Sequence, residues 1–156
     1  MEGITDTADV SSARIDAPAE RIYLASAYER KDEMLGVRDV LTALGYTVTS
    51  RWIDQPPGEG LGTAELDADP ARGVPYAELD LEDLCAADTV ISFTGQGGRG
   101  GRHAEFGWAL ALRRYGNPVR LILVGPREHV FHSLPEIEHY PDWSRLVMAL
   151  SRPVRA

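Results

Sequence analysis

Residues Asp88-Thr89-Val90-Ile91-Ser92-Phe93 decide the predicted fold, together with the glycine-rich run Thr94-Gly95-Gln96-Gly97-Gly98-Arg99-Gly100-Gly101 that follows them. The first six residues are rich in β-branched and aromatic side chains and predict a buried strand. The glycine-rich run separates this strand from a helix predicted over 102–115, and the apolar run 118–125 predicts the next strand. A strand, a helix and a second strand in this order are typical of a right-handed βαβ unit in a parallel sheet.

The same alternation continues toward both ends of the chain. Further strands are predicted at 21–26, at 46–52 and near 137–140, and further helices at 28–44, 75–87 and around 142–150. We therefore predict a doubly wound α/β fold, with a parallel sheet of four to five strands and helices on both faces. Residues 54–74 are dense in Gly, Pro and acids, and we predict a long loop there that serves as a lid or binding segment.

Length and composition fit one globular domain. The chain has 156 residues, 44% of them hydrophobic and 26% charged. We predict a flexible acidic tail over 1–20 and a single domain over 21–156. Only Cys85 could contribute to a disulfide, which excludes an internal disulfide framework.

Charge and hydropathy restrict partners and location. The net charge of −8 argues against nucleic acid as the main partner. No apolar stretch is long enough to span a membrane, and the acidic N-terminus lacks the features of a signal peptide. We therefore expect a cytoplasmic protein that acts on a small molecule.

The carboxyl ends of the predicted strands are where ligands bind in such sheets. This rule points to Ala25–Glu29, which includes Ser26, to the segment 94–105, and to the loop 125–132, which includes His129. In the second of these, Gly98 and Gly101 can present backbone N–H groups to an anion, beside the guanidinium groups of Arg99 and Arg102. The run matches neither a P-loop nor a clean G-x-G-x-x-G motif, so a plain flexible connector remains the alternative.

Glu105 is the most informative residue of the chain. We expect it in the first turn of its helix, at the head of an apolar stripe of Trp108, Ala109 and Leu112 that faces the sheet. A carboxylate there is partly desolvated, and a second acid nearby raises its pKa further. The alternative is a helix-capping glutamate without chemistry.

A second carboxylate is available from Asp80 or Asp83, which precede the third strand. Paired acids in unlike environments suit glycosidic chemistry, with one as nucleophile and the other as proton donor. His129 and His132 lack a third ligand in the sequence pattern, and we predict neither a metal nor a cofactor.

Three segments resemble the nucleoside 2-deoxyribosyltransferase family, which includes the related 2′-deoxynucleoside 5′-monophosphate N-glycosidases. They are Ile22-Tyr23-Leu24-Ala25-Ser26, Asp80-Leu81-Glu82-Asp83-Leu84-Cys85-Ala86-Ala87-Asp88-Thr89-Val90 and Ala104-Glu105-Phe106-Gly107-Trp108-Ala109-Leu110-Ala111. The resemblance covers residues 21–125. It implies a flavodoxin-like, Rossmann-like fold, a homodimer or higher homo-oligomer, and cleavage of the bond between a base and a deoxyribose.

The resemblance also implies roles for single residues. Glu105 matches the nucleophile that attacks the anomeric carbon, Tyr23 the tyrosine that orients it, and Asp80 the acid that binds the sugar or assists proton transfer. Arg99 stands where many transferases carry an aspartate that contacts the base. An arginine there favours a 5′-phosphate substrate, and with it hydrolysis.

Two further functions remain open at this point. A protein of this fold can bind a nucleotide as a sensor without turnover, because fold alone does not establish activity. The second open function is cleavage of a larger nucleotide such as NAD, because the long 54–74 segment could enclose a bigger ligand.

Overall fold

Five parallel strands in the order β2-β1-β3-β4-β5 form the centre of the computed structural model, which describes residues 19–56 and 61–152. The strands are β1 (Arg21–Ala25), β2 (Thr47–Val48), β3 (Thr89–Phe93), β4 (Arg120–Val124) and β5 (Ile137–Tyr140). Every neighbouring pair is parallel, as predicted. This strand order is the one of flavodoxin-like folds.

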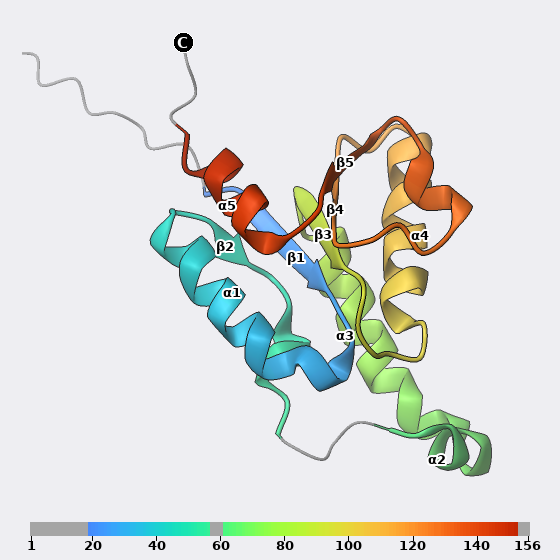
Figure 1. Cartoon of the computed structure of the whole chain (residues 1–156). Helices are drawn as coiled ribbons and strands as arrows, with labels where there is room; N and C mark the ends of the chain where they lie inside the picture. The colour runs from blue at the N-terminus through green and yellow to red at the C-terminus, as the bar shows by residue number, and fades with distance from the viewer. Residues whose placement is uncertain (1–18, 57–60, 153–156) are drawn as a thin grey trace, which may run out of the picture.

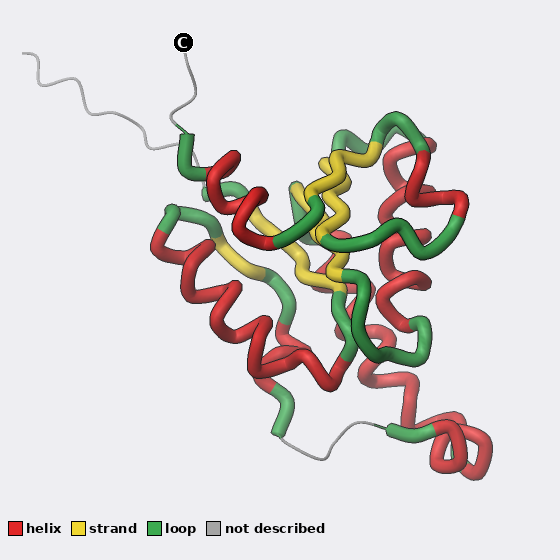
Figure 2. The backbone as a smooth tube through the Cα atoms, viewed as in Figure 1, coloured by secondary structure: helices red, strands yellow, loops and turns green. Residues whose placement is uncertain are grey.

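Helices cover both faces of this sheet. The α-helices are α1 (Lys31–Ala43), α2 (Thr63–Ala68), α3 (Val74–Cys85), α4 (Gly101–Arg114) and α5 (Trp143–Leu150). Short 3₁₀ helices are η1 (Tyr28–Arg30), η2 (Arg51–Asp54), η3 (Pro70–Gly73) and η4 (Val130–Ser133). Helices α1 and α5 lie on one face and α3 and α4 on the other (Figure 1), and the strands lie between these two layers (Figure 2).

The core follows from the apolar spacing in the sequence. All five residues of β3 are buried, as a parallel strand covered on both faces requires. Helix α1 buries Met34, Val37 and Leu41, which share one face at helical spacing. It ends before Gly45, whose φ of 94° a residue with a side chain rarely adopts.

The predicted strand over 46–52 is wrong beyond Val48. The Asp83 carboxylate accepts hydrogen bonds from the backbone N–H of Arg51 at 2.8 Å and from Arg51 Nε at 2.7 Å. These contacts accompany the 3₁₀ turn η2, in which Trp52 Nε1 donates to the Leu24 carbonyl oxygen at 2.8 Å. Strand β2 therefore ends after two residues, and the chain then contacts the carboxyl end of β1 through Trp52.

The predicted loop over 54–74 is also partly wrong, because it contains α2 and η3. Pro70 stands at the start of η3, where its missing N–H costs nothing. Residues 57–60 lie outside the described part, and so does most of the predicted N-terminal tail over 1–20. None of the described helices combines the length and the apolar character needed to cross a membrane.

Candidate active site

A cleft of about 450 Å³ opens beside the carboxyl ends of β1 and β3. These neighbouring strands continue into α1 and α4, which lie on opposite faces of the sheet (Figure 1). Ligands in doubly wound folds bind at this kind of switch point. The cleft is lined by Ser26, Ala27, Tyr28, Glu29, Trp52, Gln55, Leu61, Leu66, Gly73, Tyr76, Asp80, Gly98, Arg99, Gly100, Gly101, Arg102 and Glu105.

Glu105 projects from α4 into this cleft. The helix begins at Gly101, so Glu105 is its fifth residue and lies beyond the first turn. The predicted position in the first turn is therefore wrong. Burial raises the pKa of Glu105 to about 8, and the negative charge of Asp80 adds to this effect. Its Oε2 atom is buried and has no hydrogen-bond partner among the described residues. Such a carboxyl group is held out of water without being neutralised by a cation.

The apolar stripe predicted behind Glu105 is only partly present. Ala109 is buried and Leu112 is half-buried, but Trp108 is 47% exposed. Phe106 takes the buried position instead. Helix α4 therefore presents a large aromatic side chain to solvent.

Asp80 reaches the same cleft from α3, and α3 packs against α4. Burial raises the pKa of Asp80 to about 6, and the charge of Asp83 contributes. Its Oδ1 atom is buried and unpartnered within the described chain. Asp83 has a different role, since it is held by Arg51 as described above. The sequence offered Asp80 and Asp83 as partners for Glu105, and the structure places only Asp80 in the cleft with it.

Tyr23 lies behind Glu105, on β1. Its side chain is fully buried and does not line the cleft. Burial is the main cause that raises the pKa of Tyr23 well above its usual value, and the charge of Glu105 is the next. The Tyr23 hydroxyl in turn lowers the pKa of Glu105, as a donor to the carboxylate would. Within normal hydrogen-bond geometry, however, the Tyr23 hydroxyl has no partner among the described residues. The hydroxyl and the Glu105 carboxylate therefore lie near each other without a regular hydrogen bond.

The glycine-rich run forms one wall of the cleft and is more than a flexible connector. Gly95, Gly97, Gly98 and Gly100 all have positive φ, which side chains disfavour. At Gly98 an added Cβ would come within 2.5 Å of Arg102 Nη1 and 3.1 Å of the Ala27 Cβ. The sequence at this position is therefore fixed by close packing as well as by backbone conformation.

Arg102 is used to hold this loop. It is 6% exposed, and its Nη1 donates to the Gly97 carbonyl oxygen at 2.7 Å. Its Nη2 donates to both carboxylate oxygens of Glu128, at 3.2 and 3.0 Å. Glu128 also accepts from the backbone N–H of Gly95 at 3.0 Å. Arg102 borders the cleft, but most of its donors are already engaged by the protein.

Arg99 is the more accessible of the two arginines. It is exposed and lines the cleft, and its Nη1 donates to the Leu61 carbonyl oxygen at 3.1 Å. This bond joins the glycine-rich loop to the segment that precedes α2. Ser26, Gly98 and Gly101 also line the cleft, in keeping with their predicted placement.

His129 does not line the cleft. It lies instead beside His103, with His129 Nε2 3.3 Å from His103 Nδ1, and its ring packs on His132. The sequence offers only His129 and His132 as neighbouring ligands, whereas the structure adds His103 to this group.

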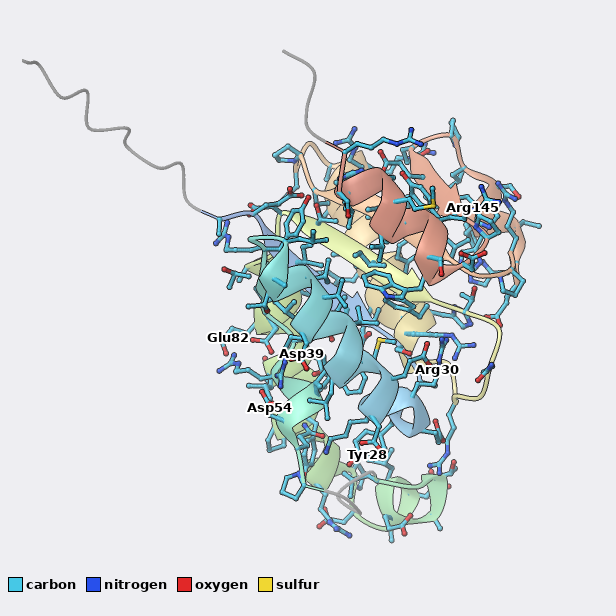
Figure 3. The ribbon with its side chains drawn as sticks, turned by 60° about the vertical axis from the view of Figure 1, so that its left-hand side comes forward. Tyr28, Arg30, Asp39, Asp54, Glu82 and Arg145 are labelled. Carbon is cyan, nitrogen blue, oxygen red and sulfur yellow. The ribbon has the colours of Figure 1, made fainter. Side chains whose placement is uncertain are left out.

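Three aromatic residues line the cleft that the sequence analysis does not place there. Tyr76 lies four residues before Asp80 on α3, so helical spacing could have placed both on one face. Tyr28 follows β1 and donates its hydroxyl to the Pro56 carbonyl oxygen at 3.1 Å. Figure 3 shows Tyr28 at the end of the molecule where α2 lies. Trp52 completes this set, and its place depends on the turn η2 that the sequence did not predict.

Two solved structures share the fold of this chain. One is a 2-deoxyribosyltransferase from Bacillus psychrosaccharolyticus, with a TM-score of 0.59 and 20% identity over 86% of this chain and 93% of the other. The second is a CMP N-glycosidase from Clostridium botulinum, with a TM-score of 0.52 and 19% identity over 85% of this chain and 100% of the other. No protein-family model matches the sequence, and no curated protein matches it significantly. At these identities the likeness establishes the flavodoxin-like fold.

Proposed function

We propose that this protein cleaves the N-glycosidic bond of a 2′-deoxynucleoside or of its 5′-monophosphate. The sugar is transferred first to Glu105 and then to another base or to water. The observation that carries the proposal is the convergence of Glu105 and Asp80 on one cleft, with the pKa of one at about 8 and of the other at about 6. Two acids that share one proton in one site suit a glycosidic double displacement. These pKa values place the proton mainly on Glu105, so the reaction proceeds from the minor form in which Asp80 holds it and Glu105 is ionised.

The first step is attack by the ionised Glu105 carboxylate on the anomeric carbon of the sugar. A bond forms from a Glu105 oxygen to this carbon, and the bond to the base breaks, so that the base leaves with the electron pair. Asp80 in its protonated form can supply the proton that the leaving base needs. Tyr23 supports the step by favouring the charged form of Glu105.

In the second step a water molecule or an acceptor base attacks the same carbon from the opposite side. The ester bond to Glu105 breaks and the carboxylate is restored. Asp80, deprotonated in the first step, can then accept a proton from the attacking group. Hydrolysis and transfer therefore share one set of residues, and the chemistry of the acceptor separates them.

The two structural neighbours support this proposal, because one is a 2-deoxyribosyltransferase and the other a CMP N-glycosidase. The residues that resemble the deoxyribosyltransferase family, Tyr23, Asp80 and Glu105, are also those whose pKa values rise together in this site. Sequence motif and electrostatics thus point to the same three side chains.

A panel of deoxynucleosides and deoxynucleoside monophosphates tests the proposal, with release of free base as the readout and with acceptor base present or absent. Glu105→Gln should abolish base release, while Glu78→Gln, an exposed acid on the helix of Asp80, should not. Mass spectrometry of acid-quenched wild-type protein should find a deoxyribosyl group on the peptide that contains Glu105. Base release by Glu105→Gln at the wild-type rate would refute the role of Glu105. Nucleotide-dependent thermal stabilisation without any base release would instead indicate a sensor.

A further inference from the structure

Three of the four histidines of the chain gather at one place outside the cleft. His103 comes from the first turn of α4, and His129 and His132 come from the segment after β4. One ring nitrogen from each lies within 4.8 Å of the other two. None of the three lines the cleft, so the proposed glycosidic reaction does not account for them.

The spacing of the ring nitrogens matches that of metal ligands. His103 Nδ1 and His129 Nε2 are 3.3 Å apart. Two nitrogens bound to one tetrahedral zinc ion at 2.0–2.1 Å are also separated by about 3.3 Å. His132 is 1% exposed, and its Nε2 is buried without a partner among the described residues. An unpartnered buried nitrogen beside the other two offers the third ligand.

Glu128 provides the support that a metal-binding histidine usually has. Its Oε2 lies 3.0 Å from His103 Nε2, so the carboxylate holds the proton of His103 on Nε2 and leaves the lone pair on Nδ1. This is the nitrogen that faces His129. Because Glu128 is also held by Arg102 at 3.0 Å, its position does not depend on the histidine alone.

We propose that His103, His129 and His132 form a binding site for one divalent transition-metal ion with the ligand preferences of Zn²⁺. Three imidazoles and a water molecule satisfy its usual coordination. The ion would join the start of α4, two residues before Glu105, to the segment that follows β4.

Binding requires a local rearrangement of two rings. His132 Nδ1 accepts a hydrogen bond from the backbone N–H of Glu128 at 3.1 Å, which places the proton of the neutral ring on Nε2. The rings of His129 and His132 also lie only 3.7 Å apart between centroids. The lone pair of His103 Nδ1 faces His129 Nε2, so the proton of His129 also lies on Nε2. Metal binding requires both rings to move this proton to Nδ1, which in His132 breaks the hydrogen bond from Glu128, and it requires the two rings to separate. Val130 and Phe131, between the two histidines in sequence, are exposed in the single chain, so their side chains do not hold this short turn against the rest of it.

Titration of the untagged, chelator-treated full chain with Zn²⁺ by calorimetry tests the site. A Cys85→Ser background removes the exposed thiol as a competing ligand. We expect one ion per chain with micromolar or tighter affinity, and a rise in the unfolding temperature on binding. Co²⁺ should give the visible absorption of a tetrahedral site. Glu128→Gln should weaken binding roughly ten- to a hundredfold.

The fourth histidine gives a matched control. His139→Gln should bind Zn²⁺ like the parent, because His139 lies outside the cluster and contacts the Gly125 carbonyl oxygen. His103→Ala, His129→Ala and His132→Ala should each lose stoichiometric binding. His129 is half-exposed, so His129→Ala decides the matter even if loss of the buried His132 unfolds the chain. Absence of micromolar binding by the parent, or unchanged binding by His129→Ala, overturns the proposal and leaves that of glycosidic cleavage untouched.

Discussion

Asp80 and Glu105 line the same cleft from two helices that pack on each other, and the charge of Asp80 helps to raise the pKa of Glu105 to about 8. The pair therefore titrates as a unit. Between pH values of about 6 and about 8 it holds one proton and one negative charge. The proton lies mainly on Glu105, which has the higher pKa, and the form that the proposed reaction needs, with Glu105 ionised and Asp80 protonated, is the minor form of the same total charge.

The first prediction concerns the pH dependence of kcat/KM. We expect a bell-shaped profile for base release, with limbs near pH 6 and pH 8, because only the singly protonated pair is productive. In Asp80→Asn the rate should fall roughly a hundred- to ten-thousandfold. Its profile should rise to a plateau with a midpoint below 8, because the neighbouring charge is gone. An unchanged bell in Asp80→Asn would show that Asp80 is not part of the titrating pair.

A second prediction links Glu105 to stability. Because its pKa is raised in the folded state, the protonated form favours folding, and this contribution is lost as the pH rises from about 4.5 to about 8. Glu105→Gln cannot ionise, so it should be more stable than wild type by roughly 2–4 kcal/mol at pH 8 and similar to it at pH 5. Urea unfolding at both pH values measures the difference. Equal destabilisation at both pH values would mean that Glu105 is not held in a desolvated site.

Tyr23→Phe isolates the buried hydroxyl behind the nucleophile. The hydroxyl lowers the pKa of Glu105, so its loss should move the alkaline limb of the rate profile, near pH 8, to higher pH. At neutral pH we expect a loss of about tenfold or less in kcat/KM. The unfolding temperature should stay the same or rise, because the hydroxyl is buried without a partner among the described residues. A large loss of stability would point to a purely structural tyrosine.

The two arginines of the glycine-rich loop should respond differently. Arg99→Ala should lower kcat/KM about ten- to a hundredfold for a deoxynucleoside monophosphate and hardly at all for the deoxynucleoside, if the loop binds a 5′-phosphate. Arg102 holds Gly97 and Glu128, so Arg102→Ala should lower the unfolding temperature and weaken both substrates together. Equal effects of Arg99→Ala on both substrates would exclude a phosphate contact at this residue.

A homodimer is the remaining prediction. Trp108, Val130 and Phe131 are 47%, 79% and 60% exposed, and a symmetric dimer is the commonest assembly that would bury such side chains. Light scattering at micromolar concentration should give twice the mass of the chain. Phe131→Asp should reduce it to the monomer, and Met148→Asp, an exposed apolar residue on α5 at the opposite face of the sheet from α4 (Figure 1), should not. A wild-type monomer would refute this assembly.

The sequence predicted the sheet well where strands are buried on both faces. The apolar runs of β1, β3 and β4 predict buried strands, because a parallel central strand that is covered on both faces is apolar throughout. The end of β2 could not be predicted in the same way. It depends on the contact of Asp83 with Arg51, 32 residues earlier in the chain, and no local pattern reports such a pairing.

The site was predictable to the extent that it follows from strand ends and from motif spacing. Glu105 and Asp80 follow that rule and lie in the cleft. The partner of Arg102 is Glu128, 26 residues away, so the loop-holding role of Arg102 was not evident. The place of His103 beside His129 and His132 could not be predicted for the same reason, since these two come from another loop.

The packing of α3 on α4 has a practical consequence for redesign. The positions of Asp80 and Glu105 depend on this helix contact, whereas Gln55, Leu61 and Leu66 reach the cleft from a separate segment. Among the described residues, this segment is tied to the body by hydrogen bonds from Arg99 to Leu61 and from Tyr28 to Pro56. Exchange of residues 61–68 should therefore reshape the ligand-binding wall while the carboxyl pair stays in place. For the proposed reaction, libraries that vary this wall alone are the direct way to alter base selectivity.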